Sequence, residues 1–503
     1  MVDTNFVEDH EGLHYDVCTH NISVDGAANH WLLDAQLLAP TASSERVLNS
    51  IQDITFRAEA VARPEVANHD IYRPEAMRTI ESEIDRLGPQ LRELSLKIHS
   101  HPELRFREQF AHDALSDFMA NQGFEVTRRY MSHVPSKESP RFMTTAWRAA
   151  FTHTPKRAQA NRSIRTLGVN SEMDALPIPR GSASHACGHN LIAVAGVAVA
   201  VGVKRALEVH DVAGSVVLLG TPAEEGGHGK VRLIEAGAYK DMDACIMCHP
   251  GSGPAHMVVN AGSLAIQAID VQFKGKPAHA ALQPWDGINA QDAVVQSFNS
   301  ISMLRQQLRP DLRVHGVVRF DKSSLPVNVI PSDMSMVWNI RAPTKEGLDD
   351  LRQRVVKCFQ GAAAATGCTV SIICKQPLLN LQQNAALARE FERTAVNWCG
   401  LTAAKVEDSG AFSTDFGNVT YEVPGLHPAY TIPTANGGAN HTAEFATAAA
   451  TKEAHDATIQ VAKALALTGF RILDDEAFFR QVKDVFTSLQ AIGSEQEKAE
   501  AEI

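Results

Sequence analysis

The sequence is poor in cysteine and has no excess of positive charge. Its eight cysteines among 503 residues are too few and too scattered for a disulfide framework. Cys245 and Cys248 lack a second pair of the kind that a zinc ribbon needs, so we interpret them as strand packing. Lysine and arginine number 47 against 58 acidic residues, a net charge of −11, which offers no basic patch for a phosphate backbone. We therefore expect no nucleic-acid partner.

Long apolar segments are also missing. The longest run, Leu191 to Val203, ends at Lys204 and is shorter than the about 20 residues that a membrane-spanning helix needs. The chain starts with acidic residues such as Asp3 and Glu8 instead of a basic end and an apolar stretch. Its last three residues, Ala-Glu-Ile, form no retrieval or peroxisomal signal. These features predict a cytoplasmic protein with no membrane partner.

The remaining composition is that of a soluble globular protein. Hydrophobic residues make up 44% and charged residues 21%, which excludes a fibrous, low-complexity or wholly disordered chain. The length predicts two or three domains, or one large domain that carries an insertion.

Strands and helices alternate through most of the chain. Residues 1–75 show no sustained period and are interpreted as an N-terminal extension with brief helical stretches at 42–60. Two helices follow, at 74–94 and 109–122. The later pattern predicts strands at 166–173, 215–220, 244–248 and 428–432, and helices after Cys187 and at 229–238, 384–399 and 443–467. Short apolar strands separated by helices are typical of a mixed, mostly parallel sheet flanked by helices, an α/β fold.

A second module interrupts this pattern. The sequence predicts strands at 264–273, 314–320, 334–340 and 369–374, and helices at 289–308 and 345–366. The order β-α-β-β-α-β is that of a ferredoxin-like unit. We therefore predict a satellite domain at 259–376, a catalytic domain at 76–258 and 377–475, and a C-terminal helix and tail at 476–503, in which 494–503 is a frayed tail.

One short segment is the first to indicate chemistry. Asp174 follows a strand, and Cys187-Gly188-His189 stands at the start of a helix rich in small residues. A thiolate and an imidazole are preferred ligands of zinc-like ions, and Gly188 lets the backbone fold closely around an ion. On these residues alone, a buried cysteine beside a helix-capping histidine is an equally good interpretation.

Two further strands end in polar residues. One leads into Glu224 and Glu225 on a glycine-rich loop, and the next leads into His249. Parallel sheets place their ligands at the carboxyl ends of strands, so these side chains are expected in one crevice. Adjacent side chains of an extended segment point to opposite sides, so one glutamate can bind metal while the other faces a bound water. A solvated acidic loop and a capping histidine are the alternatives.

A run of motifs carries a family resemblance. In chain order they are Met-Asp-Ala-Leu-Pro, His-Ala-Cys-Gly-His, Thr-Pro-Ala-Glu-Glu-Gly-Gly, Cys-His-Pro, Gly-Lys-Pro-Ala-His-Ala, Val-Asn-Val-Ile-Pro and Asn-His-Thr. The run resembles the aminoacylase and carboxypeptidase-G type metallopeptidase family, and Cys-Gly-His resembles its amidohydrolase branch. His185 to Ala193, Leu304 to Leu308 and Ser413 to Val419 look most like the β-alanyl-lysine dipeptidase group. The resemblance covers roughly residues 77–470.

The resemblance implies a zinc-exopeptidase-like catalytic domain with two divalent ions per chain, zinc, or else manganese or cobalt. Glu224 matches the family's general base, and Asp174 matches the aspartate that orients a metal-binding histidine. The branch usually has aspartate where this chain has Glu172, and we expect Glu172 to touch none of the ligands. The residues that match the family's metal ligands are Cys187, His189, Glu225, His249 and His441.

The satellite domain also contains family matches. His279 matches a histidine that reaches into the neighbouring subunit's site and helps to hold the developing oxyanion, so the resemblance implies a homodimer through this domain. Asn328 and Arg341 match residues that bind the substrate's carboxylate, for which a guanidinium fork is well suited. Taken singly, a turn histidine, a strand-end asparagine and a surface arginine are ordinary features.

The sequence is therefore interpreted as a metal-dependent amidohydrolase or dipeptidase that cleaves an amide bond of a dipeptide or N-acyl amino acid with a free carboxylate. Two alternatives stay open. One is an enzyme of the same fold that cleaves or forms an amide in a biosynthetic conjugate. The other is a binding or scaffold protein without turnover, although such a protein would have no need for the complete ligand set.

Overall fold

The computed structural model describes residues 7–8, 14–15, 70–132, 143–156, 163–178, 182–319, 326–404 and 412–501. The chain divides into two compact units, Met1–Glu59 and Ala60–Ile503. In the first unit, β1 (Val7–Glu8) and β2 (His14–Tyr15) form an antiparallel pair. The brief helices predicted at 42–60 lie outside the described residues. Everything below concerns the second unit.

A six-stranded sheet forms the centre of the catalytic part. Its order is β17-β9-β5-β8-β4-β3, in which the first four strands are parallel and β4 and β3 are antiparallel additions. The bounds are β17 (Gly425–Leu426), β9 (Ala244–Ile246), β5 (Thr166–Glu172), β8 (Gly214–Thr221), β4 (Trp147–His153) and β3 (Glu125–Arg128). The predicted mixed, mostly parallel sheet is confirmed.

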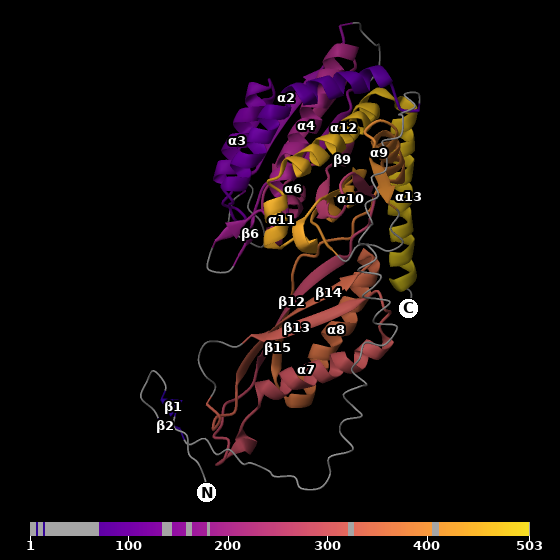
Figure 1. Cartoon of the computed structure of the whole chain (residues 1–503). Coiled ribbons are helices and arrows are strands. Elements are labelled where there is room, and N and C mark those ends of the chain that lie inside the picture. Colours follow the sequence, from indigo (N-terminus) through magenta and orange to yellow (C-terminus); the bar gives the residue numbers. More distant parts are fainter. Residues whose placement is uncertain are drawn as a thin grey trace, which may run out of the picture. The chain divides into compact units, whose positions relative to one another are not determined.

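Helices cover both faces of this sheet. In β8, Val216 and Leu218 belong to one hydrophobic core, and Val217 and Leu219 belong to another on the opposite face. The first core contains α2 (Pro74–Ser100), α4 (His189–His210) and α12 (Lys452–Asp474), which lie side by side in Figure 1. The second contains α6 (Gly229–Glu235) and α10 (Phe416–Glu422). A strand that is buried on both faces reads as a continuous apolar run, as β8 does.

Helix α4 approaches the sheet closely because of Gly196. A Cβ atom at this position would lie 2.3 Å from Ser171 Oγ and 2.9 Å from the carbonyl oxygen of Asn170, so a larger residue would push the helix away from β5. The amino end of α4, with His189 as its first residue, is thereby held beside the carboxyl ends of the strands.

A small second sheet continues two strands of the first. Its order is β10 (His249–Ser252), β18 (Ala429–Ile432), β11 (Met257–Val259), β16 (Thr402–Ala404), and His249 pairs with Ala429. The chain therefore runs from β9 into β10 and from β17 into β18 side by side. The other elements are α3 (Gln109–Asn121), β6 (Leu176–Pro177), β7 (Ala183–Ser184), α5 (Glu224–Gly227) and α9 (Ala385–Asn397).

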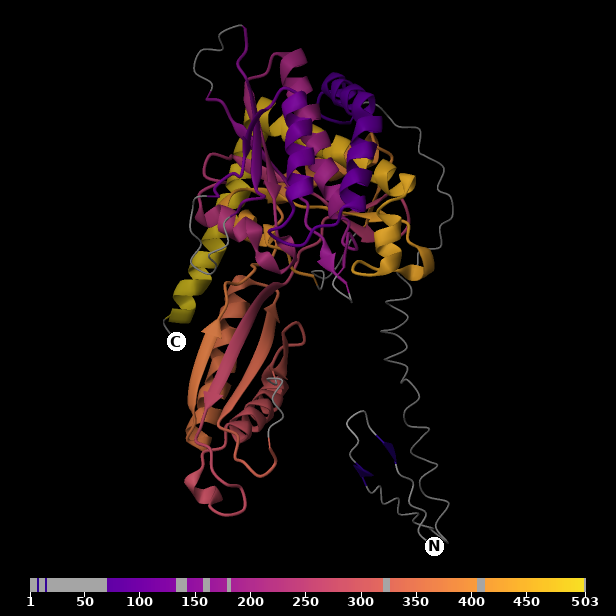
Figure 2. The ribbon, with the colours of Figure 1, turned by 90° about the vertical axis from the view of Figure 1, so that its left-hand side faces the viewer.

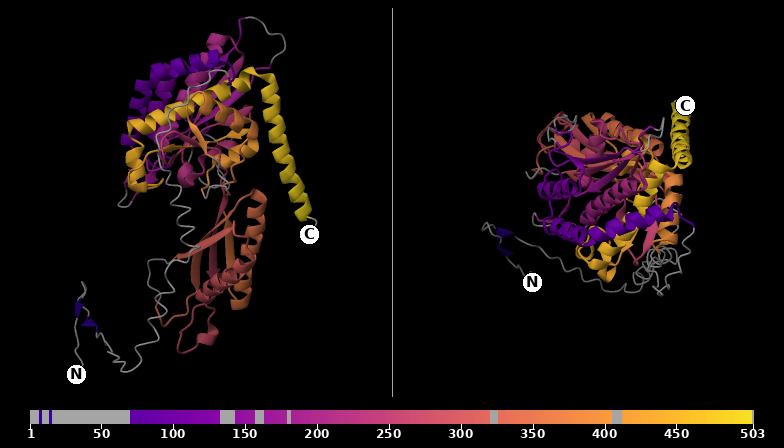
Figure 3. Two further views of the ribbon diagram at one scale, coloured as in Figure 1. Left: turned by 45° about the vertical axis from the view of Figure 1, so that its right-hand side comes forward. Right: turned by 90° about the horizontal axis from the view of Figure 1, so that it is seen from above.

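Two predictions near the C-terminus were wrong. The helix predicted at 443–467 is two helices, α11 (Ala443–Ala448) and α12, because Thr451 adopts an extended conformation and its side chain caps α12. The predicted frayed tail is helical, since α13 (Glu476–Ala501) follows α12 and continues almost to the end (Figure 3). Glutamate, lysine, glutamine and alanine dominate its last turns, and all of them favour helix.

The satellite domain has its own sheet and core. Its order is β13 (Arg313–Arg319), β14 (Asp333–Ala342), β12 (Ala265–Lys274), β15 (Thr369–Cys374), with every pair antiparallel. Helices α7 (Ala290–Leu304) and α8 (Lys345–Thr366) pack on one face of this sheet (Figure 2). The predicted β-α-β-β-α-β order is confirmed, while the exact domain boundaries stay a prediction. Within the described ranges, no helix has the length and apolar character needed to cross a membrane.

Candidate active site

Four adjacent parallel strands end at one place. The chain leaves β5 into Asp174, β8 into Glu224 and Glu225, β9 into His249, and β17 into His427. Parallel strands point their carboxyl ends to the same edge of a sheet, which is where open α/β folds form their binding crevice. The amino end of α4 adds Cys187 and His189 to this edge. Residues far apart in the sequence thus meet through the order of the strands.

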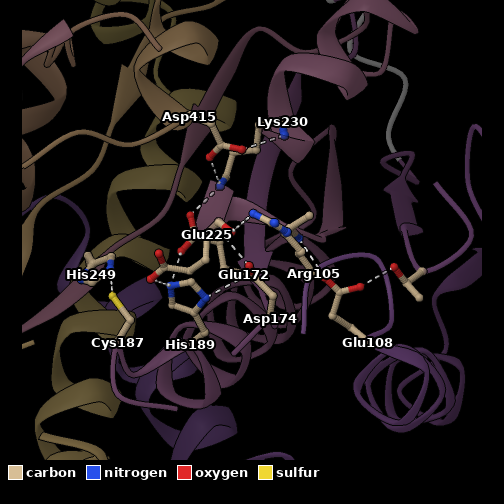
Figure 4. Close-up of polar contacts among 12 residues, drawn as sticks. Arg105, Glu108, Glu172, Asp174, Cys187, His189, Glu225, Lys230, His249 and Asp415 are labelled. Carbon is tan, nitrogen blue, oxygen red and sulfur yellow. Dashed lines mark hydrogen bonds and ion pairs between the residues drawn. The ribbon is translucent and has the colours of Figure 1, made fainter. Parts of the chain in front are cut away.

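Cys187 lies against two of the predicted ligands. Its Sγ atom is 3.4 Å from His249 Nε2, while Nδ1 of the same ring lies 2.8 Å from the Pro250 carbonyl oxygen, which sets the orientation of the ring (Figure 4). The backbone N–H of His441 donates to the Ala186 carbonyl at 2.7 Å, next to Cys187. His441 Nε2 is 3.4 Å from Glu225 Oε1. The cysteine, two histidines and a glutamate therefore share one corner of the site.

His189 stands between two carboxylates. Its Nδ1 is 3.0 Å from Asp174 Oδ1, and the other carboxylate oxygen of Asp174 accepts the backbone N–H of Glu225 at 2.9 Å. Its Nε2 is 3.5 Å from Glu172 Oε2, so the expectation that Glu172 touches no predicted ligand was wrong. Glu172 and Asp174 are two positions apart at the end of β5 and so face the same side, where the imidazole lies.

The donor set fits divalent metal ions. The ligand atoms of Cys187, His189 and His249 lie within 4.8 Å of one another, as do those of Cys187, Glu225 and His441, and those of His189, Glu224 and Glu225. His189 Nε2 is buried without a hydrogen-bond partner, as expected of an atom that receives a metal. Thiolate, imidazole and carboxylate are the ligands that zinc-like ions prefer.

A fourth acidic cluster contains a cation of its own. Carboxylate oxygens of Glu172, Glu224 and Asp415 also lie within 4.8 Å of one another. Lys230 Nζ is 2.5 Å from Glu172 Oε1 and 2.5 Å from Asp415 Oδ1, and these three side chains are fully buried (Figure 4). A buried charge is tolerated only when it is paired, and here one ammonium is paired with two carboxylates. Lys230 therefore supplies the positive charge of this cluster.

Electrostatics prepares the thiol and the general-base candidate in opposite ways. Burial opposes ionisation of Cys187, but the charge of His249 and hydrogen bonds from the neighbouring imidazoles outweigh it and lower the pKa of the thiol to about 5. Burial and the charges of Glu172, Asp415 and Glu225 raise the pKa of Glu224 well above its ordinary value. The thiol is thus a thiolate at neutral pH, while Glu224 has a high affinity for a proton.

The site opens into a cavity of about 640 Å³ that both domains line. The satellite domain contributes Arg341, whose Nη1 donates to Ser413 Oγ at 3.1 Å. His279 and Asn328 are exposed and do not line this cavity. They lie side by side on the satellite domain, where the N–H of Ala280 donates to the Asn328 carbonyl at 2.9 Å. Of the three satellite candidates, the structure brings only Arg341 to the site of the same chain.

Comparison with known proteins places this site in a family. The chain matches the model of peptidase family M20/M25/M40 over residues 168–468. It is 36% identical over 433 residues to the Xaa-Arg dipeptidase of Mus musculus, which covers 84% of this chain and 93% of the relative. The chain belongs to peptidase family M20/M25/M40. A p-aminobenzoyl-glutamate hydrolase polypeptide of Escherichia coli strain K12 is 30% identical over 309 residues, 59% of this chain and 60% of that protein.

Solved structures agree with the fold of this peptidase family. One is a putative aminohydrolase from methicillin-resistant Staphylococcus aureus, with a TM-score of 0.65 and 17% identity over 79% of this chain and 100% of that one. Another is a dinuclear metal-binding peptidase of the M20 family from Bacillus subtilis, with a TM-score of 0.57 and 17% identity over 77% of this chain and 99% of that one. The predicted family is confirmed, and the protein is a hydrolase that acts on amide bonds.

Two features of this M20-family site were missed from the sequence. Lys230 reads as an ordinary helix lysine, and nothing local indicates its burial. His427 follows β17, a strand of only two residues that shows no periodicity. A signal was present, because β9 and β17 are both followed by a histidine-proline pair, His249-Pro250 and His427-Pro428.

The state of Cys187 can be measured in this M20-family protein. In the metal-free protein, alkylation of Cys187 by iodoacetamide should rise with pH through about 5 and then level off, because the thiolate is the reactive form and burial is outweighed by the imidazoles. Burial raises the pKa of Cys245 and Cys248, so these thiols serve as internal controls that stay unmodified at neutral pH. Peptide mass spectrometry measures all three. A midpoint near the ordinary thiol value of about 8.5 would contradict the assignment.

Proposed function

We propose that this protein is a metal-dependent dipeptidase that hydrolyses the amide bond of a dipeptide or N-acyl amino acid with a free carboxylate. The observation that carries the proposal is the convergence of a thiolate, three imidazoles and two glutamates at the edge of four parallel strands. The similarity to an Xaa-Arg dipeptidase over 84% of the chain supports the substrate class.

Cys187, His189, Glu225, His249 and His441 would hold two divalent ions per chain, for which zinc is our first expectation and manganese or cobalt the alternatives. When bound, the ions would activate a water molecule and polarise the scissile carbonyl. A thioether or amide in place of Cys187 would remove the anionic donor that both ligand groups around it share. Asp174 holds His189 in one orientation through its Nδ1 atom, which leaves Nε2 available as a ligand atom.

Glu224 is proposed as the group that moves the proton. It would accept a proton from the attacking water and return it to the leaving amine, so no covalent intermediate with the protein is needed. Its surroundings suit both steps, since burial and three carboxylates favour the protonated form while Lys230 favours the ionised form. Lys230 keeps Glu172 and Asp415 at fixed positions beside Glu224.

Arg341 is proposed to bind the substrate's carboxylate, because it is the cavity-lining cation of the described satellite residues. A panel of dipeptides and N-acyl amino acids, each assayed with and without its free carboxylate, tests the function. We expect hydrolysis only of compounds with the free carboxylate, and a raised KM for these compounds in Arg341→Gln. Equal rates for acids and their amides would contradict the proposed substrate class.

The protein is further proposed to act as a homodimer through the satellite domain. His279 and Asn328 are exposed on this domain, and large apolar side chains beside them are exposed as well: Leu282 by 66%, Trp285 by 76% and Val327 by 99%. Exposed apolar groups of this size favour a partner surface. A two-fold contact would let each satellite domain present His279 to the site of the other chain.

Co-expression of two inactive variants tests this arrangement. Chains with Glu224→Ala and chains with His279→Ala should each be nearly inactive, and their mixture should regain about a quarter of wild-type activity. Random pairing makes about half of the dimers mixed, and each mixed dimer contains one site with both residues intact. Sedimentation should show a dimer. A monomer, or a mixture no more active than its components, would leave His279 as an ordinary turn residue.

A further inference from the structure

His427 occupies a position equivalent to that of His249 on the neighbouring strand. It follows β17 as His249 follows β9, and the two strands are parallel with Leu426 opposite Ile246. The two rings lie at 6.0 Å between centroids with an interplanar angle of 23°, and Phe416 packs against His427 at 5.4 Å. The proposed metal ligands do not include this second histidine.

The imidazole of His427 is rigidly held but has no polar partner. Its backbone N–H donates to Gln383 Oε1 at 2.8 Å, and its carbonyl accepts from Gln383 Nε2 at 2.7 Å. The residue is only 3% exposed, and neither ring nitrogen has a hydrogen bond within the described part of the chain. Buried polar atoms are normally satisfied, and the rare exceptions call for a functional explanation.

The ring lines the catalytic cavity, where its unpaired nitrogens set it apart. Other polar residues of the lining have partners: Asn440 donates to the Pro250 carbonyl, Ser413 to the Leu264 carbonyl, and Arg341 to Ser413. Among the lining residues that the structure describes, only His427 has a buried side-chain nitrogen or oxygen with no hydrogen bond. A ligand in the cavity is therefore the group that can satisfy it.

We propose that His427 accepts a hydrogen bond from the free amino group of a dipeptide substrate and so selects dipeptides over N-acyl amino acids. This inference rests on the proposed dipeptidase function. Desolvation keeps the imidazole neutral, which leaves one ring nitrogen as an acceptor. The carboxylates of the lining, Glu224 and Glu225, are assigned to proton transfer and metal binding. An acyl group without an amine would leave both its own site and the histidine unsatisfied.

The test compares two substrates that differ only in the amine, alanyl-arginine and N-propionyl-arginine. The metal-loaded wild-type enzyme should prefer the dipeptide. In His427→Leu, kcat/KM for alanyl-arginine should fall by about 10- to 100-fold, mainly through KM, because binding in the ground state is lost. The value for N-propionyl-arginine should stay within about 3-fold, and His427→Asn should restore part of the preference because its amide oxygen can accept.

His455→Leu is the matched control, since His455 is also a buried histidine with an unpartnered Nδ1 but does not line the cavity. It should leave the preference unchanged. Equal losses of activity on both compounds in His427→Leu, with a lower metal content, would show that His427 only supports His249 and would overturn the inference. No loss on either compound would also overturn it. If the metal-loaded wild type cleaves neither compound, the proposed function itself fails and the inference fails with it.

Discussion

Stripping divalent ions from the purified protein with a chelator is expected to abolish amide hydrolysis while leaving the fold largely intact. The five proposed ligands are held by elements that have their own hydrophobic cores, so the structure does not depend on the ions for its assembly. The reaction does depend on them, because no described group of the chain could replace them in activating water at neutral pH. Activity and metal content, measured on the same samples, should fall together.

Re-addition experiments sharpen this test. Zinc, manganese and cobalt should each be compared at about two ions per chain, and the ion that restores turnover at the lowest concentration identifies the native cofactor. Circular dichroism of the stripped sample provides the control for folding. Ligands that bind only the native state raise its stability, so the melting temperature should increase when the ions return. A folded sample that retains full activity with only trace metal would refute the two-metal assignment.

Glu224→Gln is expected to reduce turnover by about 10² to 10⁴, the usual contribution of a positioned general base, while metal content stays at the wild-type level. Glutamine keeps the size of the side chain but cannot accept and return a proton. It also removes one of the carboxylates that surround Lys230, so the buried cluster loses repulsion and should not be destabilised. Steady-state kinetics and metal analysis of the variant check both parts.

Glu225→Gln is the matched comparison on the neighbouring residue. Glu225 Oε1 lies 3.4 Å from His441 Nε2 and belongs to two of the candidate ligand groups, so its loss should lower metal content. Activity should then recover in part when excess metal is added, which is not expected for Glu224→Gln. If the two variants lost metal to the same extent, or both stayed active, the assignment of base and ligand to these two residues would be wrong.

Most of the candidate site can be predicted locally because each group directly follows a strand or precedes a helix. Asp174, Glu224 and His249 each stand after an apolar strand, and Cys187 stands at the start of α4. A parallel sheet brings such positions to one edge whatever the order of the strands. His441 had no such signal, since it lies in a loop with φ of 74°, and only the resemblance to known metallopeptidases indicated it.

Other residues of the site could not be predicted because their surroundings arise from distant segments. Lys230 is on a short helix of ordinary composition, and it is buried because Glu172 and Asp415 approach it from β5 and from the start of α10. The pairing of two buried carboxylates with one ammonium depends on how these elements pack, and a local pattern contains no record of it. The same holds for Glu172, whose contact with His189 was not expected from the sequence.

The sequence by itself determined which chemical groups are available and which elements carry them, because ligand type, strand periodicity and the β-α-β-β-α-β order are local properties. The tertiary structure decided which of these groups meet. It placed β17 beside β9 and so brought His427 against His249, and it left His279 and Asn328 exposed on the satellite domain while Arg341 reached the cavity. These outcomes depend on parallel pairing and packing between segments that are distant in the chain, where the favourable free energy comes from contacts that no short stretch of sequence contains.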